Sequence, residues 1–148
     1  MKIAIGSDHG GFLLKQAMIT FLKQNDHTIQ DCGCYSLDSV DYPDFAFPVA
    51  EAVANKTADR GIVICTTGIG VSICANKVDG IRCALCTSVF QAEMTRHHND
   101  TNVLALGAQT IDEDLARQIV SIWLRTPFDG GERHERRVGK ITQYEKKH

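Results

Sequence analysis

The segment Arg60–Lys77, RGIVICTTGIGVSICANK, predicts the central unit of the fold. It begins with an unbroken apolar run, Gly61–Cys65, which is typical of a strand buried on both faces of a parallel sheet. Thr66–Gly70 follows, and its two glycines allow a tight turn and the close approach of a ligand to the backbone. Over Val71–Val78 the apolar residues recur at helical spacing. The segment therefore predicts a strand, a glycine loop and a helix.

The glycine loop is a candidate anion-binding site, because a helix N-terminus presents unpaired N–H groups. Cys65 precedes the loop, in a position that favours the thiolate form of a thiol. The pattern is not a Walker loop, since no Gly-Lys-Ser/Thr follows, and not a dinucleotide fingerprint, since Ile73 occupies the place of the third glycine. Similar turns also occur without a ligand, and cysteine is often simply buried, so this segment alone leaves both interpretations open.

The composition is typical of one globular domain. The chain has 148 residues, of which 43% are hydrophobic and 23% charged, which is enough for a sizeable core. The net charge of -2 disfavours nucleic acid as a partner. No apolar run approaches the ~20 residues that cross a membrane, and no signal-peptide pattern opens the chain. We therefore expect a cytoplasmic protein with no membrane partner.

Most of the six cysteines are typical of reduced core thiols rather than of disulfides. Cys65, Cys83 and Cys86 lie in apolar, strand-like runs, and Cys74 lies on an apolar helix face. Cys83 and Cys86 have the spacing of zinc ligands, yet no second pair lies nearby in the sequence. We expect neither a metal nor a redox site there.

Strands and helices alternate along the whole chain. The expected strands are Lys2–Gly6, Thr28–Asp31, Gly61–Cys65, Gly80–Thr87 and Asn102–Leu106. The expected helices are Phe12–Lys23, Asp41–Asn55, Val71–Val78, Ser88–His97, one from Thr110 or Asp112 to Arg125, and Glu135–Lys147. This alternation predicts one α/β domain over residues 1–148, a Rossmann-like three-layer sandwich around a five-stranded parallel sheet, with an extra C-terminal helix.

Ligands bind such sheets at the carboxyl ends of the strands, so the loops Ser7–Gly11 and Thr66–Gly70 are the first candidates. Asp8 and His9 in the first loop could orient each other or hold sugar hydroxyls. Asp and Gly also favour turns without any ligand, and taken alone that interpretation is the stronger one.

Two further clusters of ionisable residues could contribute to a site. Arg96–Asp100, RHHND, could supply a histidine acid or base, or could be a solvated helix C-terminus. A metal site from His9, His97 and His98 lacks any recognisable ligand spacing, so we expect none. Between residues 130 and 148, six Lys/Arg oppose three Asp/Glu, which suits phosphate binding and equally suits a solvated, ion-paired helix face.

Taken together, five segments of the chain resemble the type B ribose-5-phosphate isomerases, of the family that also holds the galactose-6-phosphate isomerase subunits. The resemblance spans nearly the whole chain, in the same order. The segments are IGSDHGG (5–11), DYPDFA (41–46), GIVICTTGIGVSICANK with GIR (61–77 and 80–82), HNDTNVLALGA (98–108) and RHERRVGKI (133–141).

The resemblance implies a role for each matching residue in an aldose–ketose isomerisation without metal or cofactor. Cys65 is similar to the base that moves a proton between C1 and C2, and Thr67 to the residue that assists it. The residues implied to bind the substrate or intermediate are the enediolate loop Thr66, Gly68, Ile69 and Gly70, the sugar-binding Asp8 and His9, and the phosphate-binding Arg133 and Arg137. His98, beside Asn99, is similar to the ring-opening acid/base. The family also implies a homodimer or homotetramer with sites between subunits.

The residues themselves fit this chemistry, since isomerisation needs a base over carbon, N–H dipoles at the enediolate oxygen and an acid/base for ring opening. Thr66 and Gln109 depart from the family, which often has glycine and in some members arginine at these positions. Two alternatives remain: an isomerase of allose 6-phosphate or galactose 6-phosphate, and a non-catalytic phosphosugar-binding module.

Overall fold

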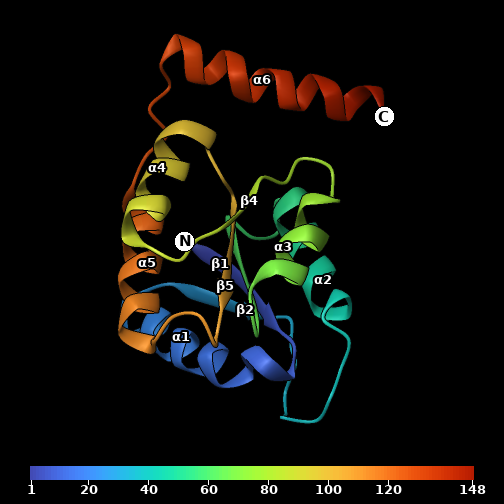
Figure 1. Ribbon diagram of the computed structural model, residues 1–148, viewed down its shortest axis with the longest axis vertical. Helices are drawn as coiled ribbons and strands as arrows, with labels where there is room; N and C mark the ends of the chain where they lie inside the picture. Colours follow the sequence, from blue (N-terminus) through green and yellow to red (C-terminus); the bar gives the residue numbers. More distant parts are fainter.

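Five parallel strands form one sheet, in the order β2-β1-β3-β5-β4 (Figure 1). The computed structural model describes all residues from 1 to 148. The strands are β1 (Lys2–Ser7), β2 (Thr28–Asp31), β3 (Arg60–Cys65), β4 (Cys83–Leu85) and β5 (Val103–Gly107). Because each crossover between parallel strands carries a helix, both faces of the sheet are covered.

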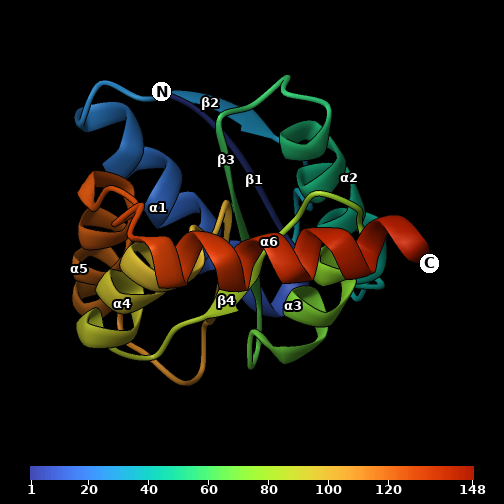
Figure 2. The ribbon, with the colours of Figure 1, turned by 90° about the horizontal axis from the view of Figure 1, so that it is seen from above.

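Six α-helices surround the sheet, with α1, α4 and α5 on one face and α2 and α3 on the other (Figure 2). They are α1 (Phe12–Gln24), α2 (Pro43–Ala54), α3 (Ile69–Asn76), α4 (Val89–Asn99), α5 (Glu113–Arg125) and α6 (Glu132–Lys147). The expected three-layer α/β fold with an extra C-terminal helix is thus confirmed. None of the helices combines the length and the apolar character that a membrane span requires.

The core consists of two clusters, one on each face of the sheet. Alternate residues of β3 point to opposite faces, so Ile62 and Ile64 contribute to the cluster under α1 and α5, while Val63 and Cys65 contribute to the cluster under α2 and α3. All four side chains are at most 5% exposed. Burial on both faces explains why the apolar run of this strand does not alternate with polar residues.

The starts of two helices, α4 and α5, follow from side-chain caps. Ser88 accepts a hydrogen bond from Gln91 N (3.2 Å), as expected for an N-cap, and α4 begins at the next residue. For α5 the cap is Asp112 rather than Thr110, since its Oδ1 accepts from Leu115 N at 2.8 Å. These two bonds satisfy backbone donors that would otherwise lack partners.

Several boundaries differ from the expectation by one to three residues, and three elements illustrate why. The strand expected over Gly80–Thr87 is only β4, because Gly80 has a positive φ of 84° and Arg82 is held by the loop that precedes β5. The helix α3 begins at Ile69, since the left-handed Gly68 turns the chain directly into it. The helix α6 begins at Glu132 and therefore includes Arg133 in its first turn.

The order of the strands brings the carboxyl ends of β1 and β3 together at the point where the connections diverge to opposite sides of the sheet. The loops Ser7–Gly11 and Thr66–Gly70 therefore lie side by side at this end. The helix α6 crosses the other end of the molecule, where α4 finishes (Figure 1). The fold thus places the loops Ser7–Gly11 and Thr66–Gly70 at one end of the molecule, and α6 with the end of α4 at the opposite end.

Leu104 in β5 tests the importance of the larger core cluster. Its side chain is fully buried, so Leu104→Ala leaves a cavity between the sheet and α5. We expect the free energy of unfolding to fall by about 2–5 kcal/mol, measured by urea denaturation at fixed protein concentration. The control Leu13→Ala removes a side chain that is 67% exposed and should change the same quantity by less than about 0.5 kcal/mol. Equal losses would contradict this description of the core.

Candidate active site

Cys65 is the last residue of β3, and its thiol lies at the N-terminus of α3. The side chain is 5% exposed, and Sγ accepts a hydrogen bond from Gly68 N at 3.1 Å. Gly68 has φ 78°, and an added Cβ would lie 2.5 Å from Leu85 Cδ1, so the turn requires glycine. An N–H donor and the positive end of a helix thus both face the sulfur, and both favour a negative charge there.

The two threonines of the loop are exposed beside this thiol. Thr67 Oγ1 accepts a hydrogen bond from Ile69 N (3.2 Å), which leaves its own hydroxyl proton free to donate. Thr66 is held through its carbonyl oxygen, which accepts from Gln109 N at 2.9 Å. The exposed hydroxyls of Thr66 and Thr67 are therefore available to a ligand at the loop.

Asp8 and His9 approach the glycine loop from the end of β1. Asp8 N donates to Ile64 O (3.3 Å), and the buried Asp8 carboxylate accepts from Gly11 N at 3.1 Å. His9 Nδ1 accepts from Val40 N at 3.2 Å, so Nδ1 carries no proton and the neutral ring carries it on Nε2. This contact sets the tautomer in which Nε2–H can donate to a ligand.

Tyr42 belongs to the same region, although its sequence pattern predicted no role beyond a position in the DYPDFA segment. A Cβ added at Gly70 would lie 2.8 Å from two ring atoms of Tyr42, so the ring lies directly against the glycine loop. Gln109 is also near, since it lines a cavity of about 470 Å³ together with His9 and Leu37. The Cys65 end thus gathers residues from four loops.

The other predicted residues form a second cluster at the opposite end. His98, Asn99, Arg133 and Arg137 line a cavity of about 350 Å³ between the end of α4 and the start of α6. The His98 ring stacks on His134, with 4.6 Å between centroids and 13° between planes. His134 is a residue of this cluster for which the sequence carried no signal except its place in the RHERRVGKI segment. Such a set of guanidinium and imidazole groups suits a phosphate.

Within one chain the two clusters are too far apart to act on one small molecule. Cys65 pairs with Gly107 at the end of β5, whereas Gly61 pairs with Val103 at its beginning. The four steps from Val103 to Gly107 alone span about 13 Å at ~3.3 Å per residue. His98 lies a further five residues before Val103, at the end of α4. A general acid must reach its proton within about 2.6–3.2 Å, so Cys65 and His98 of one chain cannot act on the same small molecule.

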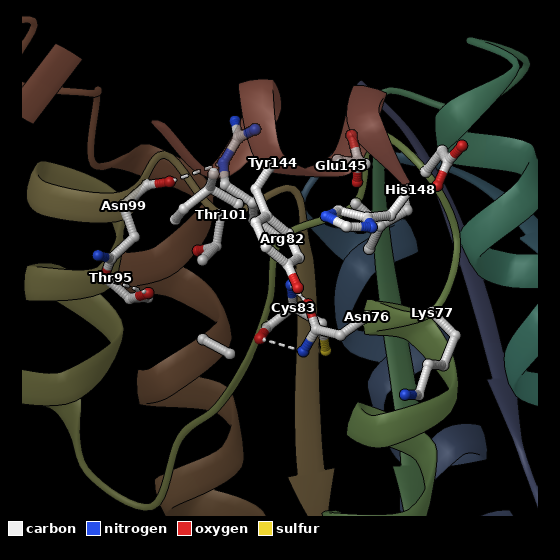
Figure 3. A pocket seen from close by; sticks show the side chains of 14 residues that line it. Asn76, Lys77, Arg82, Cys83, Thr95, Asn99, Thr101, Tyr144, Glu145 and His148 are labelled. Atoms are coloured by element: carbon white, nitrogen blue, oxygen red, sulfur yellow. Dashed lines mark hydrogen bonds between the residues drawn. The ribbon is translucent and has the colours of Figure 1, made fainter. Parts of the chain in front are cut away.

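The largest cavity, about 850 Å³, lies under α6 and contains neither Cys65 nor Asp8. Figure 3 shows Arg82 crossing it, where Arg82 Nε donates to Asn99 O at 2.8 Å. Tyr144 from α6 lines the cavity and remains 68% exposed. Because Asn99 and Ile141 line both this cavity and the His98 cluster, the two hollows form one continuous surface.

The thiols of Cys74, Cys83 and Cys86 are protonated at neutral pH. Burial raises the pKa of Cys86 to about 12. Burial, with a smaller effect of the charge on Cys86, raises the pKa of Cys83 even further. Burial also raises the pKa of Cys74, with a smaller effect of Cys65. All six cysteines are free. No group of three or more His, Cys, Asp or Glu is arranged to hold a metal, and His9 lies at the other end of the sheet from His97 and His98.

Comparison with known proteins identifies close relatives over the full chain. The family model described as ribose/galactose isomerase matches residues 3–141. A ribose-5-phosphate isomerase B of Escherichia coli is 45% identical over 146 residues, which cover 99% of this chain and 97% of that protein. Among solved structures, a Clostridium thermocellum ribose-5-phosphate isomerase B has a TM-score of 0.97 at 56% identity, and 99% of each chain is covered. One from Mycoplasma genitalium, solved with bound ribulose 5-phosphate, has a TM-score of 0.94 at 42% identity over 99% and 97% of the chains.

His134 should make the stability of the protein sensitive to mild acid. Burial, with smaller effects of His98 and Arg133, lowers the pKa of His134, so below pH ~6.5 the unfolded chain binds its proton more tightly than the folded one. The stability that the neutral His134 ring contributes to the folded protein is fully present above this pH and is lost as the pH falls. We expect the decrease in Tm between pH 7.5 and 5.5 to be smaller for His134→Gln than for the wild type. His148→Gln, at the exposed C-terminus, is the control, and an unchanged decrease in His134→Gln would contradict the expectation.

Proposed function

Because the chain belongs to the ribose/galactose isomerase family, we propose that it interconverts ribose 5-phosphate and ribulose 5-phosphate by proton transfer between C2 and C1. The observation that carries the mechanism is the position of Cys65 Sγ at the carboxyl end of β3, next to a loop of N–H groups. A base beside fixed dipoles is what enediolate chemistry requires. A non-catalytic binding module would need neither this thiol nor His98.

The step at carbon begins when the Cys65 thiolate removes the proton from C2 of the open-chain aldose. The electron pair forms the C1–C2 double bond, and the negative charge moves to O1. The N–H groups of the loop from Thr66 to Gly70 stabilise this charge, and Thr67 donates its hydroxyl proton to the same region. Cys65 then returns its proton to C1, while the proton on O2 moves to O1 and the C2 carbonyl forms.

Ring opening precedes this step and requires an acid/base at the ring oxygen and the O1 hydroxyl. In our proposal His98 supplies it, with Asn99 beside it, and Asp8 and His9 hold the sugar hydroxyls. Arg133 and Arg137, one helical turn apart on α6, bind the phosphate. These two arginines lie in the same cavity as His98, which supports their joint action on one substrate.

We propose that two copies of the chain complete each site, since Cys65 and His98 lie at opposite ends of one chain. The Cys65 end of one copy would face the His98 end of another, in a homodimer or homotetramer. Exposed apolar side chains around the Cys65 loop support a partner there: Ile69 is 53% exposed, Ile73 is 55% exposed and Tyr42 is 41% exposed. The family includes galactose isomerases, so allose 6-phosphate and galactose 6-phosphate should be assayed beside ribose 5-phosphate.

Replacement of the proposed base should abolish turnover without unfolding the protein. We expect Cys65→Ala to lower kcat for ribose 5-phosphate by at least ~10²–10⁴-fold while calorimetric binding of the substrate persists. The matched control Cys86→Ala removes a thiol that is 1% exposed on the other face of the sheet. It should lower Tm through a cavity and leave kcat unchanged. Near-normal turnover by Cys65→Ala would exclude the thiol base.

Replacement of His98 should affect the two directions unequally. We expect His98→Asn to slow ribose 5-phosphate turnover by ~10²–10⁴-fold, because the cyclic aldose must first open. Ribulose 5-phosphate cannot close a normal furanose ring, so its turnover should fall less. Initial rates in both directions measure the difference, and His97→Asn should leave both nearly unchanged. Equal losses in both directions at saturating substrate would place His98 in the carbon step or in binding instead.

Mixed dimers test whether the sites are shared between copies. Co-expression of Cys65→Ala and His98→Asn chains yields dimers in which one shared site carries both lesions and the other carries none. If half of the dimers are mixed and one of their two sites works, activity should return to about a quarter of the wild-type value. No recovery in isolated mixed dimers would mean that each chain acts alone.

A further inference from the structure

Lys15, in α1, is the largest charged side chain that is completely buried in this protein. Its Nζ lies 2.6 Å from Asp31 Oδ1, and the ammonium also lies over the rings of Phe12 and Tyr35, at 5.7 and 5.3 Å from their centroids. Removal of an ammonium from water is costly even when it is paired, and an apolar residue of similar volume often fills such a place without loss of stability. The mechanism proposed above does not use this charge, so its presence calls for another explanation.

Asp31 connects this buried charge to the segment 32–42, which joins β2 to α2. The same Oδ1 that pairs with Lys15 accepts a hydrogen bond from Gly33 N at 2.9 Å. The backbone carbonyl of Asp31 accepts from the Tyr35 hydroxyl at 3.1 Å. The beginning of the segment is thus fixed by contacts that converge on Lys15 and Asp31.

The segment then runs alongside the end of β1 and reaches the residues around Cys65. Ser7 N donates to Gly33 O (2.6 Å), and Cys34 N donates to Ser7 O (2.7 Å), directly before Asp8. Near its far end, Val40 N donates to His9 Nδ1. A continuous chain of hydrogen bonds and backbone therefore leads from the Lys15 ammonium to the imidazole of His9.

We propose that Lys15 is a positioning residue, which acts through Asp31 to hold segment 32–42 where Val40 fixes the tautomer and orientation of His9. The expected effect of Lys15 on turnover rests on the substrate-binding role proposed above for His9. The expected effect on the tautomer of the His9 ring does not depend on that role. A neutral side chain at position 15 would fill the space and leave Asp31, whose side chain is 30% exposed, to water. The segment would then lose the charge that orders its beginning.

The direct test compares Lys15→Met with the wild type by NMR of the His9 ring nitrogens. Lys23→Met is the matched control, since Lys23 lies in the last turn of the same helix and is exposed. In Lys15→Met we expect the Nδ1 and Nε2 resonances of His9 to move towards the averaged values of a ring that exchanges tautomers. The control should show wild-type resonances. Unchanged His9 resonances in folded Lys15→Met would overturn the proposal.

Turnover provides a second readout through a double-mutant cycle with His9→Ala. We expect Lys15→Met to lower kcat/KM for ribose 5-phosphate by ~10–100-fold in the wild-type background and by less than about twofold in the His9→Ala background. Equal losses in both backgrounds would mean that Lys15 acts through general stability, and would overturn the proposal. If His9→Ala alone is fully active, the role proposed for His9 fails while the NMR result still decides the role of Lys15.

If Lys15→Met does not fold, Lys15→Met/Asp31→Asn takes its place, because this variant leaves no lone charge at the site. Its Tm establishes the folded state, and the same two readouts then apply. Wild-type His9 resonances and turnover in the folded double variant would show that the buried pair is not needed for positioning.

Discussion

The position of β3 is the constraint on which the rest of the structure depends. The strand pairs with β1 on one edge and with β5 on the other, and helices cover both of its faces. Its last residue, Cys65, therefore has no freedom to move along or across the sheet. The turn at Gly68 then directs the chain back into α3, so that the backbone N–H of Gly68 donates to the sulfur. N–H groups fixed in this way need little rearrangement to stabilise a negative charge, which is the condition for efficient electrostatic stabilisation.

A parallel sheet also explains why Cys65 and His98 lie at opposite ends of one chain. Every βα loop lies at one end of the sheet and every αβ loop at the other, so the end of α4 cannot approach the end of β3. The helix α6 increases this separation, since it extends across the far end and contacts mainly α4. The similarity to structures of ribose-5-phosphate isomerases B covers nearly the whole chain, α6 included.

Much of the fold was predictable because its signals are local. The apolar run before Cys65, the glycine loop, and the caps at Ser88 and Asp112 each act over a few residues. The burial of Lys15 was not predictable, because its partner Asp31 lies sixteen residues away on β2. A lysine in an amphipathic helix such as α1 is also expected to face the solvent. The stacking of His98 on His134 likewise depends on where α6 crosses the molecule. The strand β4 is short because Arg82 makes tertiary contacts with Asn99 and Asn102. The strand propensity of the residues in this segment does not predict these contacts. The roles of the individual site residues remain predictions.

The basic cluster at the start of α6 also affects how quickly an anion reaches the protein. The chain as a whole is slightly acidic, with a net charge of -2, so a phosphate ester experiences weak repulsion over most of the surface. Arg133 and Arg137 place two positive charges beside the cavity that contains His98. Such a local field acts over about 8 Å at physiological ionic strength and extends further in dilute salt. If Arg133 and Arg137 bind the phosphate as proposed, diffusional capture of a sugar phosphate should be faster at low ionic strength and should be directed to this end of the molecule.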